Sequence, residues 1–414
     1  MTKRLAIFGT SLVLVFCLLL GISSCSMKIY AQNLMEGYKA SPRPTEALKE
    51  DTKAAMLDAY AALAEGTLCT PEGGLVSPLS VVAALTMAVI GAEGDTLAQM
   101  EAALGCSRDE LLSFFSSYIA SLEGDALKLA FSVWLNETAL AVNDRFLQTN
   151  ADYLGADVYA APFDSRTLED INRWVKQNTD HMIDKILDSL DAQTVMCLIN
   201  ALAFDAEWET KYEKSQIEVG GFTDIGGNWS ETTVMHSTEG LYLDTDDAVG
   251  FIKYYEGRDY AFVALLPKEE GADALYDLVR GLDGASLSSL LSSAENRTVR
   301  ATMPAFERDS TFQLNQVLAQ MGMTDAFDPS LANFSGMGTA GGNLYLSDVL
   351  HKTYIEVSAT GTRAAAVTAI TVKCTSLAPS DDTVSVVLDR PFFYMIVDTS
   401  TGMPLFMGTL TSAN

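Results

Sequence analysis

Histidine is scarce in this sequence, and the catalytic arrangements that depend on it are missing. The three histidines, His181, His236 and His351, stand far apart and lack metal-site spacing such as HExxH. The G-x-S-x-G motif of α/β-hydrolases does not occur. A Cys–His nucleophile pair built on Cys374 is conceivable, but Cys374 lies in a polar segment with nothing rigid to hold a base beside it. The sequence therefore predicts a protein that is not an enzyme and that uses no metal and no cofactor.

Cations are also few. The chain has 27 Lys and Arg against 54 Asp and Glu, a formal net charge of −27 at pH 7. Its first 24 residues hold two of the cations and no acid, so the remainder carries 25 minus 54, or −29. No basic stripe runs along the sequence, which argues against nucleic acid as a partner. The charge instead indicates a soluble, self-repelling surface.

Long apolar runs are rare, and one opens the chain. Leu5 to Leu20 follows Lys3 and Arg4 and is too short and one-sided for a transmembrane helix. The next residues, Ile22-Ser23-Ser24-Cys25, resemble a bacterial lipobox. The resemblance implies a signal peptide over residues 1–24, lipidation of Cys25 and anchorage at the cell surface, on the outer side of a bacterial membrane. A plain secretory signal or an uncleaved anchor is the alternative.

Residues 25–50 contain Pro42 and Pro44 and lack a long apolar run, so we expect them to be largely a lipidated tether. Residues 51–414 contain no internal repeat and no second linker, which predicts one large domain. Apolar spacing predicts helices first and strands afterwards, an α+β fold. The expected helices are Glu46 to Glu65, Val81 to Ile90 and Thr167 to Leu190. The expected strands are Thr194 to Phe204, Ala248 to Tyr255, Tyr260 to Leu266, Val299 to Phe306, Leu344 to Val349, Phe392 to Val397 and Leu405 to Leu410.

Gly336, Gly338 and Gly341 match the dinucleotide motif G-x-G-x-x-G. That motif requires a strand before it and a helix after it, whereas here a polar loop precedes and a strand is expected to follow. We therefore interpret these glycines as part of a loop.

The segment from Gly361 to Ser385 has no helical stripe, and its second half is polar. Long structureless connections are uncommon in compact domains, and those that occur are usually functional or disordered. In its first half, one parity carries small and β-branched residues and the other carries Arg363 and Lys373 at its ends. One face of such a strand could enter a sheet while the other keeps its cations in water. A flexible surface loop is the alternative.

Five stretches, in order along the chain, resemble the serpin family. They are SPLSVVAALTMAVIGAEGDTLAQM (77–100), LINALAFDAEW (198–208), MPAFERDSTFQLNQVLAQMGMTDAFD (303–328), the hinge-like IEVSATGTRAAAVTA (355–369), and VVLDRPFFYMIV with PLFMGTL (386–397 and 404–410). The resemblance implies a single serpin domain over residues 51–414, with large β-sheets, surrounding helices and an exposed reactive-centre loop at about residues 359–385. His351 with Lys352 matches the family's HK pair and is expected to orient structure at the foot of the loop.

The resemblance also implies a function: covalent trapping of a serine protease, or alternatively a cysteine protease, by a monomer that acts as a suicide substrate. The hinge would begin at Gly361, which is expected to permit a bend, and at Thr362, and it would continue through Ala364, Ala365 and Ala366, all of them small. Trp208 resembles the tryptophan at the end of the sheet where insertion starts; an ordinary core tryptophan is the alternative. Without a basic stripe, no activation by heparin is expected. Cys69, Cys106, Cys197 and Cys374 allow three disulfide connectivities. We expect Cys197 to be a buried thiol and Cys374 to be free, because a bridge there would oppose insertion.

Two departures from the family pattern leave alternatives open. Where serpins usually have acidic residues around the hinge glycine, this chain has Ala359, Thr360 and Arg363, and a serpin-like binding scaffold without inhibitory action is the competing hypothesis. The loop is also longer than usual. Counting from Gly361 places the reactive bond at Thr375-Ser376, which favours an elastase- or subtilisin-like protease. The alternatives are Lys373, which suits a trypsin-like pocket, Cys374, and Ser380, reached by counting back from Pro391.

Overall fold

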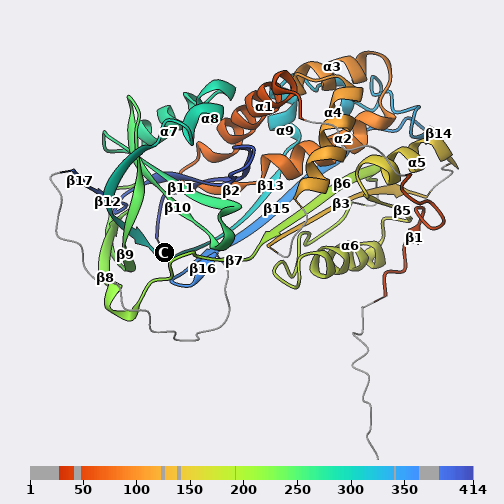
Figure 1. The fold of residues 1–414 in the computed structure, drawn as a ribbon. Coiled ribbons are helices and arrows are strands. Elements are labelled where there is room, and N and C mark those ends of the chain that lie inside the picture. The colour runs from red at the N-terminus through yellow and green to blue at the C-terminus, as the bar shows by residue number, and fades with distance from the viewer. Residues whose placement is uncertain are drawn as a thin grey trace, which may run out of the picture.

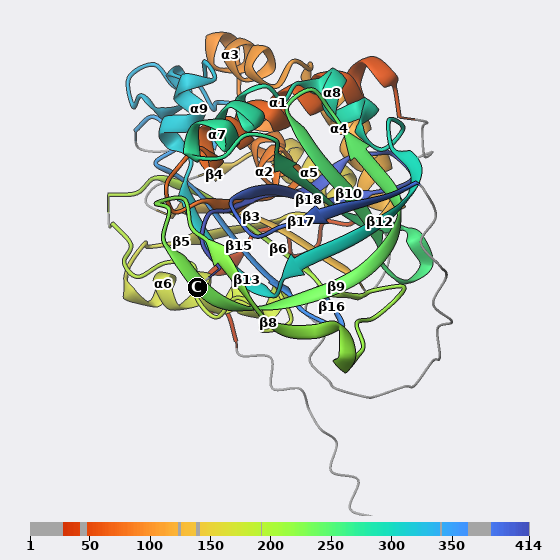
Figure 2. The ribbon, with the colours of Figure 1, turned by 90° about the vertical axis from the view of Figure 1, so that its left-hand side faces the viewer.

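The computed structural model describes residues 28–41, 48–122, 126–137, 141–191, 193–339, 342–362 and 382–413. Two large β-sheets form the framework; most helices gather along one side of it, and α6 lies on the other (Figures 1 and 2). Within the described residues no helix is long and apolar enough to cross a membrane. The helices are α1 Glu50–Leu68, α2 Pro78–Gly91, α3 Gly94–Leu104, α4 Arg108–Ser121, α5 Asp144–Tyr153, α6 Ser165–Asn178, α7 Ala272–Arg280, α8 Gly284–Leu290 and α9 Asn315–Gln320.

The first sheet has the strand order β1-β5-β3-β6-β15-β16-β7, and β13 pairs with β15. Its two central strands, β6 and β15, run parallel and pair directly from Asp348 with Cys197 to Thr353 with Leu202. The strands are β1 Gln32–Asn33, β3 Leu127–Asn136, β5 Asp157–Ala161, β6 Met196–Phe204, β7 Ala206–Glu207, β13 Phe306–Gln313, β15 Asp348–Val357 and β16 Gly361–Thr362.

The second sheet has the order β17-β12-β9-β10-β11-β18-β19-β2, and β8 pairs with β9. Its strands are β2 Gly74–Val76, β8 Ile217–Thr223, β9 Trp229–Asp244, β10 Ala248–Tyr254, β11 Tyr260–Pro267, β12 Glu295–Pro304, β17 Thr383–Val387, β18 Phe392–Asp398 and β19 Pro404–Leu410. A small separate sheet pairs β4 Ala141–Val142 with β14 Gly338–Thr339, so Gly338 of the glycine motif lies in a two-residue strand within a connection. Short 3-10 turns occur at Lys214–Gln216, Glu256–Arg258 and Asp325–Phe327.

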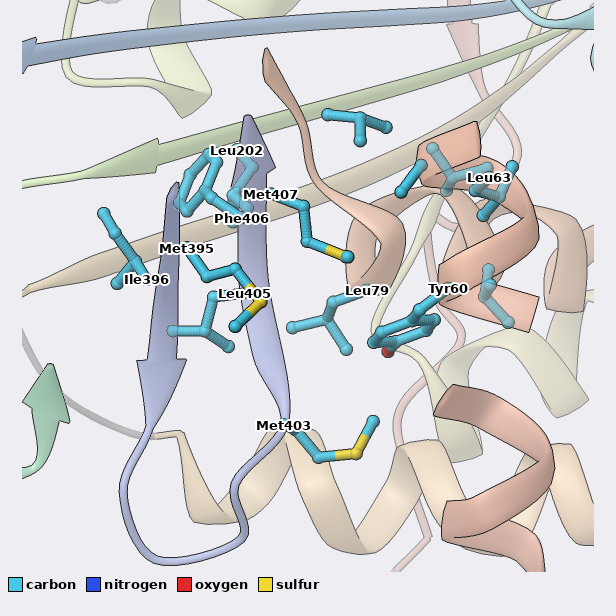
Figure 3. Packing of buried hydrophobic residues seen from close by; sticks show 14 of the residues in the cluster. Tyr60, Leu63, Leu79, Leu202, Met395, Ile396, Met403, Leu405, Phe406 and Met407 are labelled. Carbon is cyan, nitrogen blue, oxygen red and sulfur yellow. The ribbon is translucent and has the colours of Figure 1, made fainter. Parts of the chain in front are cut away.

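The main core lies where α1 and α2 meet the β18–β19 hairpin. Figure 3 shows Leu79 of α2 between Tyr60 of α1 and Leu405 of the hairpin, and Phe406 of the hairpin beside Leu202 of β6. Every residue of α2 is buried, as its all-round apolar sequence predicts. The helix begins with Pro78 at a position where proline removes no intrahelical hydrogen bond. α2 therefore packs against both sheets, on β3 and β6 of the first and on β19 of the second.

The predicted α+β fold is confirmed, and so are most of the expected strands, within one or two residues at their ends. The expected strand Leu344 to Val349 is wrong: residues 342–347 are irregular, and β15 begins only at Asp348. The expected strand Val299 to Phe306 is divided, because β12 ends at Pro304 and β13 begins at Phe306. The first helix is displaced along the chain and runs over Glu50–Leu68.

The helix expected from Thr167 to Leu190 is also wrong beyond Asn178. Asp180 and His181 adopt left-handed backbone conformations, with φ of 46° and 63°, which a helix cannot contain. Ile183 and Ile186 are nevertheless buried, because the irregular segment that follows packs into the same small core. The apolar spacing thus identified core residues correctly and their secondary structure incorrectly.

The expected tether is wrong for residues 28–41, which lie on the folded body. Gln32 and Asn33 form β1, which pairs with Ala160 and Tyr159 of β5. The domain therefore gains an edge strand from a segment whose composition suggested a linker.

Candidate functional site

The hinge begins at the end of the first sheet where β15 leads into the turn before β16. After β15 ends at Val357, the chain turns and returns as β16, antiparallel to β15 on one side and to β7 on the other. Thr362 pairs with Val357 and with Ala206, so the first two hinge residues already lie between neighbouring strands of the sheet. Before this point in β15, from Asp348 to Thr353, β15 pairs directly with β6.

Trp208 holds the turn that precedes the hinge. Its backbone N–H donates to the Thr360 carbonyl at 2.9 Å, and its indole Nε1–H donates to the Ser358 carbonyl at 2.8 Å. The Tyr212 N–H donates to the Ala359 carbonyl at 2.9 Å. Trp208 is a fully buried aromatic side chain, and it also hydrogen-bonds the turn before the hinge. The two interpretations, a core tryptophan and a tryptophan at the end of the sheet near the hinge, therefore do not exclude each other.

The side chain of Tyr255 contacts both Thr362 and Trp208. Its ring stacks on Trp208 with 4.4 Å between the centroids, and its hydroxyl hydrogen-bonds the hydroxyl of Thr362. Both side chains are fully buried. Burial raises the pKa of the Tyr255 phenol far above its usual value, so the group stays neutral and keeps its proton. This buried hydrogen bond holds Thr362 at its place in the sheet.

Gly361 is required here for space. A Cβ at this position would lie 2.2 Å from the Ala206 carbonyl oxygen and 2.7 Å from the Glu207 Cα. Gly361 is not among the residues with positive φ. We expected the glycine to permit a bend; the structure instead shows a close approach of two backbones that any side chain would prevent.

Residues 363–381 lie outside the described residues. They include Ala364, Ala365 and Ala366 of the predicted hinge and every candidate for the reactive bond: Lys373, Cys374, Thr375, Ser376 and Ser380. The segment resumes at Asp382, whose carboxylate pairs with the Arg297 guanidinium at 3.0 Å, and then enters β17 parallel to β12. Both ends of the predicted loop are therefore held in β-structure, one in each large sheet.

A polar cluster joins the two central strands below the hinge. His351 of β15 is fully buried, lies opposite Asn200 of β6, and accepts the Ser77 N–H at 2.9 Å on Nε2. Since Nε2 accepts, Nδ1 carries the proton and donates it to Asn200 Oδ1. Ser80 also donates to that oxygen, at 3.0 Å. The cluster lies in the middle of β15, and not at the foot of the loop as expected.

Burial lowers the pKa of His351 to about 3, because desolvation disfavours the charged imidazolium. The amide nitrogen of Asn200 is buried and finds no hydrogen-bond partner among the described residues. The cluster therefore holds a neutral imidazole and one unsatisfied donor at the line along which β6 and β15 would have to separate.

Sequence reasoning missed Tyr255 and Tyr212, and it gave no role to Asn200, Ser77 or Ser80. The last three lie inside the matched stretches, so a signal for them was present. The tyrosines meet the hinge through contacts between segments that are distant in the sequence, which no local pattern reveals.

The three described cysteines, Cys69, Cys106 and Cys197, are free thiols. Cys197 is fully buried in β6, as predicted. Burial raises the pKa of Cys106 to about 11 and raises that of Cys197 further. Cys374 lies outside the described residues. None of the described thiols is poised as a nucleophile.

Comparison with known proteins gives a consistent result. The family model described as "Serpin (serine protease inhibitor)" matches residues 52–413. The chain is 30% identical to Serpin B10 of Bos taurus over 373 residues, covering 81% of this chain and 92% of that protein. It is 31% identical to Iris of Ixodes ricinus over 366 residues, covering 86% and 96%.

Among solved structures, the native state of the thermophilic serpin tengpin is 41% identical, with a TM-score of 0.88 over 92% of this chain and 99% of that one. The latent state of tengpin gives a TM-score of 0.79 at 40% identity, over 90% and 100%. The fold described here is thus more similar to the native-state structure than to the latent-state one.

Proposed function

Because this chain belongs to the serpin family, a family of protease-inhibitor type, we propose that it is a cell-surface serpin that traps serine proteases covalently as a suicide substrate. The loop between Thr362 and Asp382 would be the bait. The target protease would cleave it and become attached as an acyl-enzyme, and the hinge would then insert between β6 and β15 before water releases the protease. The protein would act as an inhibitor and not as an enzyme.

The observation that carries the proposal is the position of β16. Because β6 and β15 are parallel to each other, a strand inserted between them has the same orientation toward both. The chain reverses direction after β15, so that orientation is antiparallel. β16 already has this orientation: both of its residues pair with β7, and Thr362 also pairs with Val357 of β15. Extending β16 along the same line would replace one parallel ladder by two antiparallel ones, which are slightly more stable per residue. The uninserted state is then higher in free energy and persists for kinetic reasons.

Insertion would carry the attached protease across the molecule and distort its oxyanion hole. Loss of a single oxyanion-hole donor slows acyl transfer by about a hundred- to a thousand-fold. A partial distortion therefore suffices to keep the acyl bond intact. Strand insertion competes with deacylation, and the outcome depends on how quickly the hinge enters.

For the reactive bond we propose Thr375-Ser376, with an elastase- or subtilisin-like target; Lys373, Cys374 and Ser380 are the alternatives. A cysteine protease would be attached by the same sequence of events. Incubation with an elastase and with trypsin, followed by denaturing gels and intact mass, tests both the trap and the bond. A boiling-resistant adduct with release of residues 376–414 is the expected result. Release of residues 374–414 would instead identify Lys373, and cleavage without any adduct would count against trapping.

The second candidate is a serpin-like binding scaffold. The hinge turn is tied to Trp208 and Tyr212 by three hydrogen bonds, and such fastening would also suit a loop that never inserts. A solved structure of similar fold, at 24% identity, is that of thyroxine-binding globulin in complex with thyroxine. A loop-cleaved form that melts at the same temperature as the intact form would favour this candidate.

We also propose that residues 1–24 are removed and that Cys25 is lipidated, which would hold the domain on the outer side of a bacterial membrane. Two acyl chains on one cysteine satisfy the two-signal requirement for stable anchoring. The intact mass of the membrane-extracted protein tests this directly, since diacylglycerol adds a defined mass to the residues from Cys25 onward.

A further inference from the structure

The amino-terminal arm, residues 28–41, begins with a strong attachment to α6. The backbone N–H groups of Tyr30 and Ala31 both donate to Asp170 Oδ2, each at 2.8 Å. Arg173 donates to the other carboxylate oxygen of Asp170 at 2.6 Å and to the Lys28 carbonyl at 2.7 Å. Asp170 is only 1% exposed, so these charge-assisted hydrogen bonds lie in a dry environment.

The attachment continues along the arm. Beyond β1, the Leu34 N–H donates to the Val158 carbonyl at 2.8 Å. The Tyr38 hydroxyl donates to Asp144 at 2.6 Å, and this hydrogen bond raises the pKa of Tyr38, so the donor proton is retained. Ile29 and Ala31 pack against the small core below the sheet. From Ile29 onward, therefore, the arm moves with the body.

Because the arm is attached from Ile29 onward, few residues separate the lipidation site from the folded body. Only Ser26, Met27 and Lys28 separate Cys25 from Ile29. Four residue steps span at most about 14 Å, at about 3.6 Å each. A compact domain of this length has a radius of gyration of about 21 Å and is roughly 50 Å across. A body of that size on such a tether cannot stand away from the surface, and the face nearest the tether must lie against it.

That face has the chemistry of a membrane interface. Tyr30 is 54% exposed, and its ring is surrounded by cations: the Arg166 guanidinium is 4.4 Å from the ring centroid, Lys28 Nζ 5.5 Å and the Arg173 guanidinium 5.9 Å. Tyrosine is enriched at membrane–water interfaces, and basic side chains are attracted to anionic headgroups.

Three acidic residues of the same region belong in the balance. Asp170 is buried and pairs with Arg173 at 2.6 Å, so it neutralises the charge of that guanidinium. Asp164 caps α6 by accepting the N–H groups of Arg166 and Thr167, and Glu169 is exposed on the helix. Lys28, Arg166 and Arg173 thus balance Asp164, Glu169 and Asp170, so this face is neutral, whereas the chain as a whole carries −27. An anionic surface would repel the acidic remainder of the chain more strongly than this neutral face, and Lys28 and Arg166, whose charges are not paired with Asp170, could contact its headgroups.

We propose that the face formed by Lys28, Tyr30, Arg166 and Arg173 lies against the anionic phospholipid headgroups of the membrane that holds Cys25. The inference rests on the lipidation proposed above. In Figure 1, β1 and α6 lie at one end of the molecule, and β8, β12 and β17 lie at the other. The end of the second sheet that receives the loop is therefore turned outward, toward the proteases it would meet.

The test uses the full-length lipidated protein in vesicles of phosphatidylcholine with one third phosphatidylglycerol, with and without a nitroxide on the lipid headgroup. Tyr30→Trp places a tryptophan in the proposed contact face. Val219→Trp is the matched control, because Val219 is 71% exposed on β8, at the opposite end. We expect the fluorescence added by Trp at position 30 to fall to about half or less with the nitroxide, since interfacial aromatics lie at headgroup level. The fluorescence added at position 219 should not change.

Equal quenching at both positions, or none at position 30, would overturn the proposed orientation while leaving lipidation intact. An intact mass without diacylglycerol would overturn the anchoring, and the orientation with it. As a second measurement, replacing Lys28 and Arg166 together by Glu should reduce the quenching at position 30, whereas Lys28→Arg with Arg166→Lys should preserve it. Unchanged quenching after the charge reversal would refute the role of the cations.

Discussion

Replacing Thr362 by arginine should convert the inhibitor into an ordinary substrate. Thr362 is fully buried between β15 and β7, with its hydroxyl on the Tyr255 hydroxyl. An arginine cannot occupy this position without carrying a charge into the sheet. Before cleavage the altered hinge can leave the sheet and place its guanidinium in water, so the body should fold normally. After cleavage the same residue must enter first.

The expected magnitude follows from desolvation. A buried unpaired charge costs several kcal/mol even after relaxation, and Tyr255 would also lose its partner. Taking about 3 kcal/mol at the barrier to insertion, the insertion rate falls about 150-fold. Because insertion competes with deacylation, nearly every acyl-enzyme formed on the variant should then be hydrolysed.

The assay is the stoichiometry of inhibition with an elastase, read together with gels that separate the covalent adduct from the cleaved product. Thr362→Arg should give cleaved product at the normal rate and almost no adduct. Thr362→Ser keeps a small hydroxyl-bearing side chain and should behave as the unaltered protein. If Thr362→Arg formed as much adduct as Thr362→Ser, insertion would not begin at this residue and the mechanism would be wrong.

Three further predictions follow from single contacts. Gly361→Ala should destabilise the docked hinge by about 1–3 kcal/mol through overpacking against the Ala206 carbonyl, measured as faster proteolysis of the hinge turn, with Gly240→Ala, an open position without positive φ, as the comparison. The pKa of His351 is about 3 in the folded protein and 6.5 in model compounds. His351 should therefore make its full contribution to the free energy of unfolding above pH 6.5. That contribution should fall by up to about 1.4 kcal/mol per unit as the pH drops toward 3; urea unfolding against pH measures the slope, and His351→Gln should flatten it. Asp170→Ala should release the amino-terminal arm, seen as faster hydrogen exchange at Tyr30 and Ala31 with little change in β6, whereas equal protection in the variant would mean that the carboxylate does not hold the arm.

Much of the fold could be predicted from the sequence, because buried strands and an all-round apolar helix leave strong local patterns. The runs that became β6, β11, β18 and β19 are continuous and apolar, and both of their faces are covered. The hinge was predicted from its small residues, its parity and its resemblance to serpins; the structure describes only its first two residues, Gly361 and Thr362, in β16. Its outer limits were less well predicted: the expected loop of residues 359–385 includes residues already paired in β16 and in β17.

What could not be predicted depends on tertiary contacts. The chain around Pro42 and Pro44 looks like a linker, yet Asp170, far away in sequence, holds the segment before it on the body. After Asn178 the sequence keeps apolar residues at helical spacing, but Asp180 and His181 have left-handed backbone conformations, so the helix does not continue. The need for glycine at position 361 comes from Ala206 on another strand, so local conformational reasoning gave the right residue for a different reason.

The central claim is that the loop inserts between β6 and β15 once it is cut, and the thermal unfolding midpoint of the loop-cleaved protein tests it most directly. The intact protein and the same protein nicked within residues 363–381 should be compared at one concentration and pH. The account predicts that the cleaved form unfolds at a much higher temperature, because a new antiparallel strand replaces the direct pairing of β6 with β15. An unchanged midpoint would contradict insertion, and with it the covalent trap.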